Sequence, residues 1–228
     1  MYTFIKLTVS LSIENVVARV FLVRMFSQLE AISHIVRRLL RREVHPPRND
    51  MIHNMEANMN VSDAIRLKRA VRKFQDNPLP DDVVYAILNA GRRSQSSKNN
   101  QAWQFIAIRD KQILKALSQC GQWAGHIAGA AFCVAILTPD PNEKFQIMFD
   151  AGQAAAFMQL AAWELGVGSC PASLYEFDKT RTILGFPAEW HLRVALSFGY
   201  ALEEEKISAP PKKGGRMSLD EIVHWEKW

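Results

Sequence analysis

The stretch LKRAVRKF, residues 67–74, places four cations beside apolar side chains. Leu67 and Val71 continue an apolar pattern that begins a few residues earlier. Lys68 and Arg72 lie four positions apart, a spacing that predicts two cations on one side of a helical turn. Guanidinium groups bind phosphate through paired hydrogen bonds, and an ammonium adds a point charge. The stretch therefore indicates a site for an anionic group, although such clusters are also typical of solvated surfaces.

Segments of helical and strand character alternate after this stretch. Asn60 or Ser62 is predicted to cap the helix that contains the basic residues. We expect further helices over residues 83–91, 110–122, 145–165 and 178–184, a helix or close-packed turn over 123–131, and strands over 103–108, 132–137 and 192–200. Residues 169–173 are not assigned to a helix or a strand. Strands separated by helices favour a layered α+β or α/β fold.

Two of these segments are apolar throughout. Residues 132–137 have the length of a strand and no polar position, which predicts a central strand buried on both faces. Residues 145–165 are rich in alanine and apolar nearly all round, a pattern of helices that are buried or lie in an interface. Both segments predict a substantial core.

The first 58 residues differ in character from the rest. The first fifty contain eight Lys and Arg and four acids, which leaves a net charge of +1 for the remainder of the chain. We expect residues 1–58 to be a basic extension, disordered or peripheral, and residues 59–228 to form one domain without a nucleic-acid partner. Residues 26–42 have the pattern of a basic amphipathic helix. Three interpretations stay open: a helix that contacts a membrane or partner, an organelle presequence, or an extension without a folded role.

Several classes of chemistry find no support in the sequence. Cys120, Cys133 and Cys170 are odd in number and widely spaced, which predicts reduced thiols in a reducing compartment, the cytoplasm. The chain has no GxGxxG, GxxxxGK[ST], HExxH or GxSxG motif, and its histidines stand apart. The sequence therefore favours neither hydrolysis nor a metal site.

Three further motifs follow LKRAVRKF in order: SSKNNQAW at 96–103, GVGSCPAS at 166–173 and GGRMSLDEIVHW at 214–225. With these four motifs the chain resembles the FMN-dependent nitroreductase family from about residue 60 to its end. Three residues depart from the usual motifs of that family: Ala70 replaces Ser, Ala102 replaces Pro and Gly214 replaces Lys or Arg. The loss of the hydroxyl at position 70 costs about 1 kcal/mol for one neutral hydrogen bond.

The resemblance implies a fold, a cofactor and a set of contacts. The expected fold is a three-layer α+β homodimer with a central, mostly antiparallel sheet flanked by helices. FMN is the expected cofactor, and NADH or NADPH the electron donor, in a ping-pong reduction of small nitroaromatics, quinones or similar acceptors. No catalytic side chain and no metal are expected, because the flavin transfers the electrons.

The resemblance also assigns roles to twelve residues. They are cations and one small residue at the phosphate and pyrimidine side (Lys68, Arg69, Ala70, Arg72 and Arg216), polar residues commonly supplied across a dimer interface (Ser96, Ser97, Asn99 and Gln101), and residues at the ring edge (Pro171, Ala172 and Ser173). Trp123, Phe149 and Phe157 are candidates for an acceptor pocket, although packing in the core is the commoner role of an aromatic residue.

Two alternative functions remain open. The first is a flavoenzyme of the same fold with other chemistry, such as a reductive dehalogenase, a flavin-degrading enzyme or a metabolite dehydrogenase. The second is a non-catalytic flavin- or partner-binding protein that docks through its basic N-terminal helix. That second function predicts salt-sensitive binding that is lost with residues 1–58.

Overall fold

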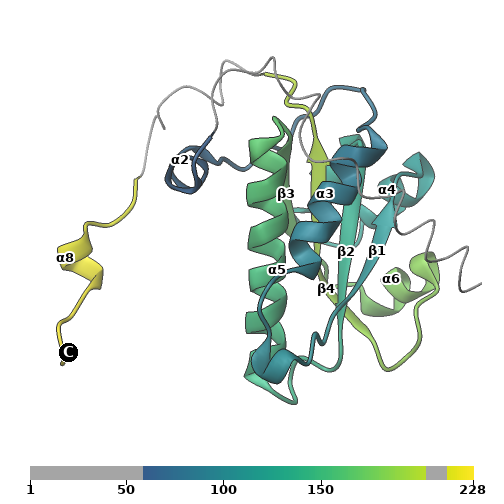
Figure 1. Cartoon of the computed structure of the whole chain (residues 1–228). Helices are drawn as coiled ribbons and strands as arrows, with labels where there is room; N and C mark the ends of the chain where they lie inside the picture. The colour runs from purple at the N-terminus through teal and green to yellow at the C-terminus, as the bar shows by residue number, and fades with distance from the viewer. Residues whose placement is uncertain (1–58, 204–214) are drawn as a thin grey trace, which may run out of the picture. The chain divides into compact units, whose positions relative to one another are not determined.

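The computed structural model describes residues 59–203 and 215–228 (Figure 1). The predicted N-terminal extension and its amphipathic helix lie outside these residues. The helices are α2 (Val61–Leu67), α3 (Asp81–Arg92), η1 (Ser97–Asn99), α4 (Lys111–Leu117), η2 (Ala124–Gly129), α5 (Phe145–Glu164), α6 (Phe177–Leu184) and α8 (Leu219–Ile222). The strands are β1 (Gln104–Ile108), β2 (Phe132–Thr138), β3 (Gly168–Ser173) and β4 (His191–Gly199). None of the described helices is long and apolar enough to cross a membrane.

The four strands form one antiparallel sheet in the order β1-β2-β4-β3. All seven residues of β2 are buried, as its unbroken apolar run predicts. β3 lies at the sheet edge and was not assigned from the sequence. Its residues GSCPAS include types that strands disfavour, and its pairing with β4, from Gly168↔Gly199 to Ser173↔Val194, decides its conformation.

Helices cover both faces of the sheet (Figure 1). Successive side chains of β2 alternate between the faces. Val134 and Ile136 pack with α3 and α5, whereas Cys133 and Ala135 pack with α4, η2 and α6. This arrangement of two helical layers around a sheet confirms the predicted three-layer α+β fold.

The predicted helix over residues 110–122 is shorter than expected. It ends at Leu117. The chain then turns and packs Gly121 against the carbonyl oxygen of Ser173, where a Cβ atom would lie 2.2 Å from that oxygen. The next residues form the 3₁₀ helix η2, in agreement with the close-packed turn predicted there.

The helical prediction for residues 67–74 is wrong. Asn60 caps α2 as predicted, since its side chain accepts a hydrogen bond of 2.9 Å from the N–H of Asp63. The helix ends at Leu67, and the backbone of Lys68 turns to a ψ of 130°. The basic residues therefore follow the helix instead of lying in it.

Pairing with the sheet edge explains this extended conformation. The N–H of Val71 donates a hydrogen bond of 3.0 Å to the carbonyl oxygen of Ser169, and the Val71 side chain is buried. Ala70 forms an isolated bridge with Ser169. Further along, Phe74 forms one with Ala201. The β-branched Val71 suits a strand, and these long-range contacts outweigh the local helical spacing of the cations.

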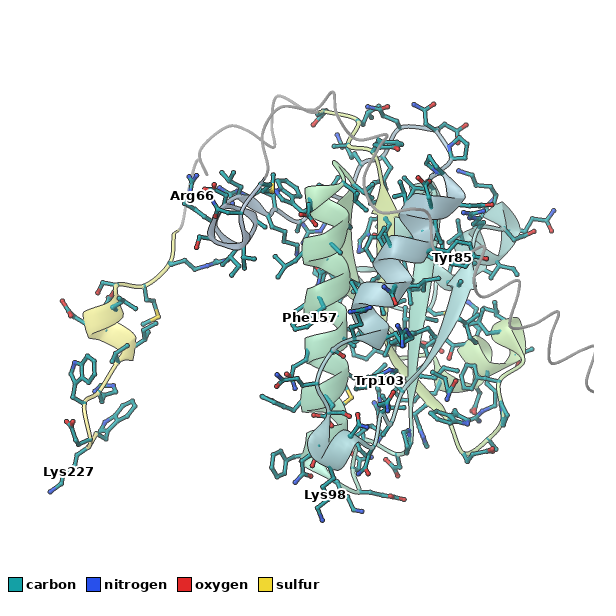
Figure 2. The ribbon with its side chains drawn as sticks, in the orientation of Figure 1. Arg66, Tyr85, Lys98, Trp103, Phe157 and Lys227 are labelled. Atoms are coloured by element: carbon teal, nitrogen blue, oxygen red, sulfur yellow. The ribbon has the colours of Figure 1, made fainter. Side chains whose placement is uncertain are left out.

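Helix α5 has two apolar faces with different surroundings. Its inner face packs on the sheet and on α3, with Ala154, Met158 and Ala162 fully buried. Its outer face is exposed, and Figure 2 shows Phe157 on its open side. The outer face consists of Phe145, Phe149, Gly152, Ala156 and Phe157. The helix is thus apolar nearly all round, as predicted, but the described residues cover only its inner face.

Candidate functional site

Two of the predicted cations, Lys68 and Arg72, lie near Cys170 of β3. Burial raises the pKa of the Cys170 thiol, and the nearby charges of Arg72 and Lys68 act against that shift. Between these cations in sequence, Ala70 pairs with Ser169. The extended residues 68–74, the motif segment, therefore pair with the sheet edge and bring an ammonium and a guanidinium close to the GVGSCPAS segment.

Lys68 is held by a residue that the sequence did not predict. Its Nζ donates a hydrogen bond to Oε1 of Gln159 on α5. The side chain of Lys68 is half-buried, and this burial lowers its pKa. The only sequence signal for Gln159 is its polarity within an apolar helix, and its partner lies 91 positions away.

Arg69 is engaged differently from its neighbours. Its Nη1 donates to the carbonyl oxygens of Arg66 at 2.9 Å and Leu67 at 3.0 Å, which satisfies groups at the end of α2. Arg69 also lines an open cavity of ≈ 160 Å³ together with Arg72, Lys73 and Glu203. Its guanidinium thus has a structural task that Arg72 does not share.

The ring-edge residues occupy the second half of β3. Pro171 and Ser173 are exposed, whereas Ala172 points into the core. Because side chains alternate along a strand, Ala172 offers only its backbone at this edge. An edge strand also turns one side of its backbone away from the sheet.

The polar loop of SSKNNQAW is anchored to α5 by Asp150. The buried carboxylate of Asp150 accepts a hydrogen bond of 2.8 Å from the N–H of Ser97. Within the loop, Oγ of Ser96 accepts one of 3.0 Å from the N–H of Gln101. Asp150 has no motif of its own, so its role was not visible in the sequence.

This loop has an unusual backbone. Lys98, Asn99 and Gln101 have φ values of 52°, 56° and 48°. Side chains other than glycine rarely adopt this left-handed region, at a cost of about 1 kcal/mol each. Such residues concentrate at functional sites, where the surrounding structure fixes them.

The cations and the polar loop lie at different ends of α5. Gln159 contacts Lys68, and Asp150 contacts Ser97. The two helical residues are separated by about 13 Å along the axis at 1.5 Å per residue. Figure 2 shows Lys98 at one end of α5 and Arg66 near the other. A single chain therefore does not bring these two groups of predicted residues together.

A half-buried histidine, His126, lies beside β3. Ser197 Oγ donates to the carbonyl oxygen of Cys170 at 3.1 Å, so it accepts its hydrogen bond of 2.8 Å from the Nδ1–H of His126. Nε2 of this tautomer has no proton. Burial and the charge of Arg72 lower the pKa of His126, which keeps the ring neutral at pH 7. No group of three or more potential metal ligands occurs among the described residues.

The remaining candidates are exposed. Trp123, Phe149 and Phe157 are 77%, 66% and 42% exposed, so none has the core role that is commoner for aromatic residues. Arg216 lies in the C-terminal segment 215–228, in which each residue is exposed. Both the acceptor-pocket residues and the second phosphate cation remain predictions.

These features define a class of protein: a three-layer α+β domain with cations along one sheet edge and a strained polar loop on its central helix. A family model described as "Nitroreductase family" matches residues 65–124 and 121–200. The chain belongs to the nitroreductase family.

Individual relatives agree with this assignment. The NADPH-dependent oxidoreductase of Staphylococcus aureus is 35% identical, over 74% of this chain and 74% of that protein. The NADH dehydrogenase of Thermus thermophilus is 25% identical, over 75% of this chain and 100% of that protein. Among solved structures, an FMN-dependent nitroreductase from Clostridium difficile superposes with a TM-score of 0.62 and 26% identity, over 72% of this chain and 98% of that one.

Proposed function

We propose that the chain is an FMN-dependent oxidoreductase that takes electrons from NADH or NADPH and reduces small electron-poor acceptors such as nitroaromatics or quinones. Membership of the nitroreductase family supports the enzyme class. The relatives named for NADPH and FMN support the donor and the cofactor. Bound FMN would supply the redox chemistry, accepting a hydride from the donor and then reducing the acceptor in a ping-pong order.

The residues at the edge of β3 fit this cofactor. The phosphate of FMN is anionic, and Lys68 and Arg72 provide charged N–H donors on one extended segment beside Cys170. The ammonium of Lys68 has three N–H donors and uses one of them in the hydrogen bond to Gln159, so two remain for a ligand. Pro171 and Ser173 are exposed beside them, with a hydroxyl for the ring edge.

The observation that carries the proposal is the division of the predicted site between the two ends of α5. A two-fold axis that packs α5 of one copy antiparallel to α5 of another places the polar loop of each beside the cationic edge of the other. The exposed apolar outer face of α5 is the surface for this packing. We therefore propose a homodimer with two sites, each completed by both copies.

Each group of residues has a task in this site. Lys68 and Arg72 bind the phosphate and the pyrimidine side, and the Ser96–Gln101 loop of the other copy provides polar contacts. Asp150 fixes the shape of that loop through Ser97. No side chain acts as a nucleophile, and solvent supplies protons to the reduced acceptor.

Two further points accompany the proposal. The family match begins at residue 65, which supports a domain over residues 59–228 that follows a separate extension over residues 1–58. All three cysteines are buried and free, which supports a reducing compartment such as the cytoplasm.

Absorbance spectroscopy of the full-length protein tests the function. We expect a bound flavin spectrum that bleaches on anaerobic addition of NADH or NADPH and returns when a quinone or nitroaromatic is added. Free FMN at the same concentration, mixed with the same donor, is the control for uncatalysed reduction. A protein that retains no flavin after incubation with excess FMN would overturn the proposal.

A further inference from the structure

Gln159 is a polar residue on the apolar helix α5, and its side-chain orientation is fixed. Its Nε2 donates a hydrogen bond of 3.2 Å to the carbonyl oxygen of Ala155, one turn earlier on the same helix. Its Oε1 accepts from the ammonium of Lys68. An ammonium has no acceptor atom, so only the amide oxygen can face it. Both ends of the carboxamide therefore have a partner in one orientation.

Lys68 is fixed from the other side as well. Its backbone N–H donates a hydrogen bond of 2.9 Å to the carbonyl oxygen of Ala64, which makes Lys68 the C-cap of α2. Its side chain then crosses to α5. A lysine side chain otherwise samples many rotamers, and binding a ligand with it requires that this freedom be lost.

The chemistry of the amide matters for an anionic ligand. A glutamate at position 159 would form an ion pair and cancel the charge of Lys68 at the site. The neutral carboxamide accepts a single hydrogen bond from the ammonium and leaves its charge intact. It orients the cation without competing electrostatically with a phosphate.

We propose that Gln159 is a positioning residue that preorganises the Lys68 ammonium for FMN. This inference rests on the proposed function, because it assumes that Lys68 contacts the cofactor. It also identifies an interaction that would offset the serine hydroxyl that Ala70 lacks. The fixed cation that would do so, Lys68, lies two residues before Ala70.

A purely structural tether between α2 and α5 is the competing explanation. Both explanations predict that Gln159→Leu changes stability. Only positioning predicts that its effect on FMN binding requires the Lys68 ammonium. A double-mutant cycle separates the two, because independent sites give additive effects and coupled ones do not.

The experiment measures FMN affinity by quenching of flavin fluorescence with full-length apoprotein. The variants are Gln159→Leu, Gln159→Glu, Lys68→Ala and the double variant Lys68→Ala/Gln159→Leu. Gln112→Leu is the matched control, since it makes the same change at an exposed position of α4. Circular dichroism and light scattering verify that each variant is folded and has the wild-type mass.

We expect Gln159→Leu to weaken FMN binding about three- to tenfold, the range for one immobilised flexible side chain. Gln159→Glu should weaken binding at least as much at low salt, and Gln112→Leu should not change it. In the Lys68→Ala background, Gln159→Leu should have no further effect.

Three results would overturn the inference in distinguishable ways. If Lys68→Ala weakens binding and Gln159→Leu does not, Gln159 is not a positioning residue, but the proposed FMN site stands. If Gln159→Leu weakens binding equally in both backgrounds, it acts independently of Lys68. If Lys68→Ala leaves affinity unchanged, the proposed placement of FMN fails and the inference fails with it.

Discussion

Lys68, Arg69 and Arg72 belong to one stretch of sequence, but their surroundings give them different tasks. Lys68 is half-buried and bonded to Gln159. Arg69 folds back on the carbonyl groups at the end of α2. Arg72 is exposed, and its charge reaches both Cys170 and His126. A charged motif thus indicates a site, but the contacts of each side chain decide how much of its charge a ligand can use.

Arg72→Ala should weaken FMN binding about tenfold or more, since a hydrogen bond to a charged group contributes about 1.5–3 kcal/mol. Arg69→Ala should have a smaller effect, because its guanidinium is already bonded to α2. Fluorescence titration of both variants with FMN gives the comparison. Equal losses in the two variants would show that Arg69 leaves α2 when the ligand binds.

His126 gives a prediction for the dependence of stability on pH. Its folded-state pKa is lowered by burial and by Arg72, so between pH 6.5 and that lower value the unfolded chain binds more protons than the folded one. The stabilisation from neutral His126 is therefore complete above about pH 6.5 and is lost as the pH falls toward the folded-state pKa.

The variant His126→Asn tests this sign, because an amide can donate to Ser197 but does not titrate. We expect it to reduce the slope of unfolding free energy against pH below about pH 6.5. Urea unfolding at fixed protein concentration measures the slope, and His224→Asn, at an exposed histidine, is the control. If the slope in His126→Asn is as steep as in the wild type, His126 is not the source of this pH dependence.

At the scale of elements, the sequence predicted those whose pattern is local. The expected strand over 132–137 and helix over 145–165 agree with β2 and α5 to within one residue at each end. β3 was not predicted, and residues 68–74 were predicted as a helix, because the conformation of both is set by pairing with residues far away in the chain. The hydrophobic period of a sequence indicates local helices and strands, but it does not show which distant residues pair in a sheet.

The same distinction holds for the candidate site. Its cations and polar loop were found because the four motifs resemble those of a family. Gln159 and Asp150 were missed because each acts on a partner distant in sequence, Lys68 and Ser97 respectively. Both are polar residues on the inner or flanking side of an apolar helix. Polarity at such a position is the one feature by which they could be sought in other sequences.

Asp150 supports a prediction for the loop that it anchors. Asp150→Ala removes the acceptor of the Ser97 N–H, and we expect a loss of about 1–3 kcal/mol in stability. Amide hydrogen exchange over residues 96–101 should become faster. The hydrogen bond between Asp150 and Ser97 holds this loop, which contains three residues in the left-handed conformation, and the variant removes that bond. Exchange monitored by mass spectrometry measures this.

Asp150→Asn is the matched control for this prediction. Its amide oxygen can still accept from Ser97, so protection of the loop should be retained in large part. Equal exchange in Asp150→Ala and wild type would mean that the loop does not depend on this bond.

At the scale of the whole molecule, two features of the domain have the same proposed explanation, a homodimer. The cations and the polar loop lie at separate ends of α5, and the outer face of the same helix exposes Phe145, Phe149 and Phe157. Exposed contiguous apolar surface generally marks an interface. In the proposed homodimer, antiparallel packing of two copies through α5 would cover this face and unite the two parts of each site.

Phe149→Glu tests this arrangement, because it places a charge on the outer face, and two-fold symmetry places it twice in one interface. We expect a monomer, or a dimer that dissociates on dilution, together with loss of FMN, since each site requires both copies. Light scattering gives the mass and the flavin absorbance gives the occupancy. Tyr85→Glu is the matched control: it changes an aromatic residue of similar exposure, 62% against 66%, on α3 (Figure 2).

The mass of each variant and its FMN occupancy together test the proposed homodimer. In Tyr85→Glu both should stay at the wild-type value. A monomeric Phe149→Glu protein that binds FMN with full affinity would mean that a single chain holds the cofactor, so the polar loop would have no part in it. A dimeric, fully loaded Phe149→Glu protein would place the interface elsewhere, because a glutamate buried without a partner costs several kcal/mol and a tight contact at this face cannot accept it.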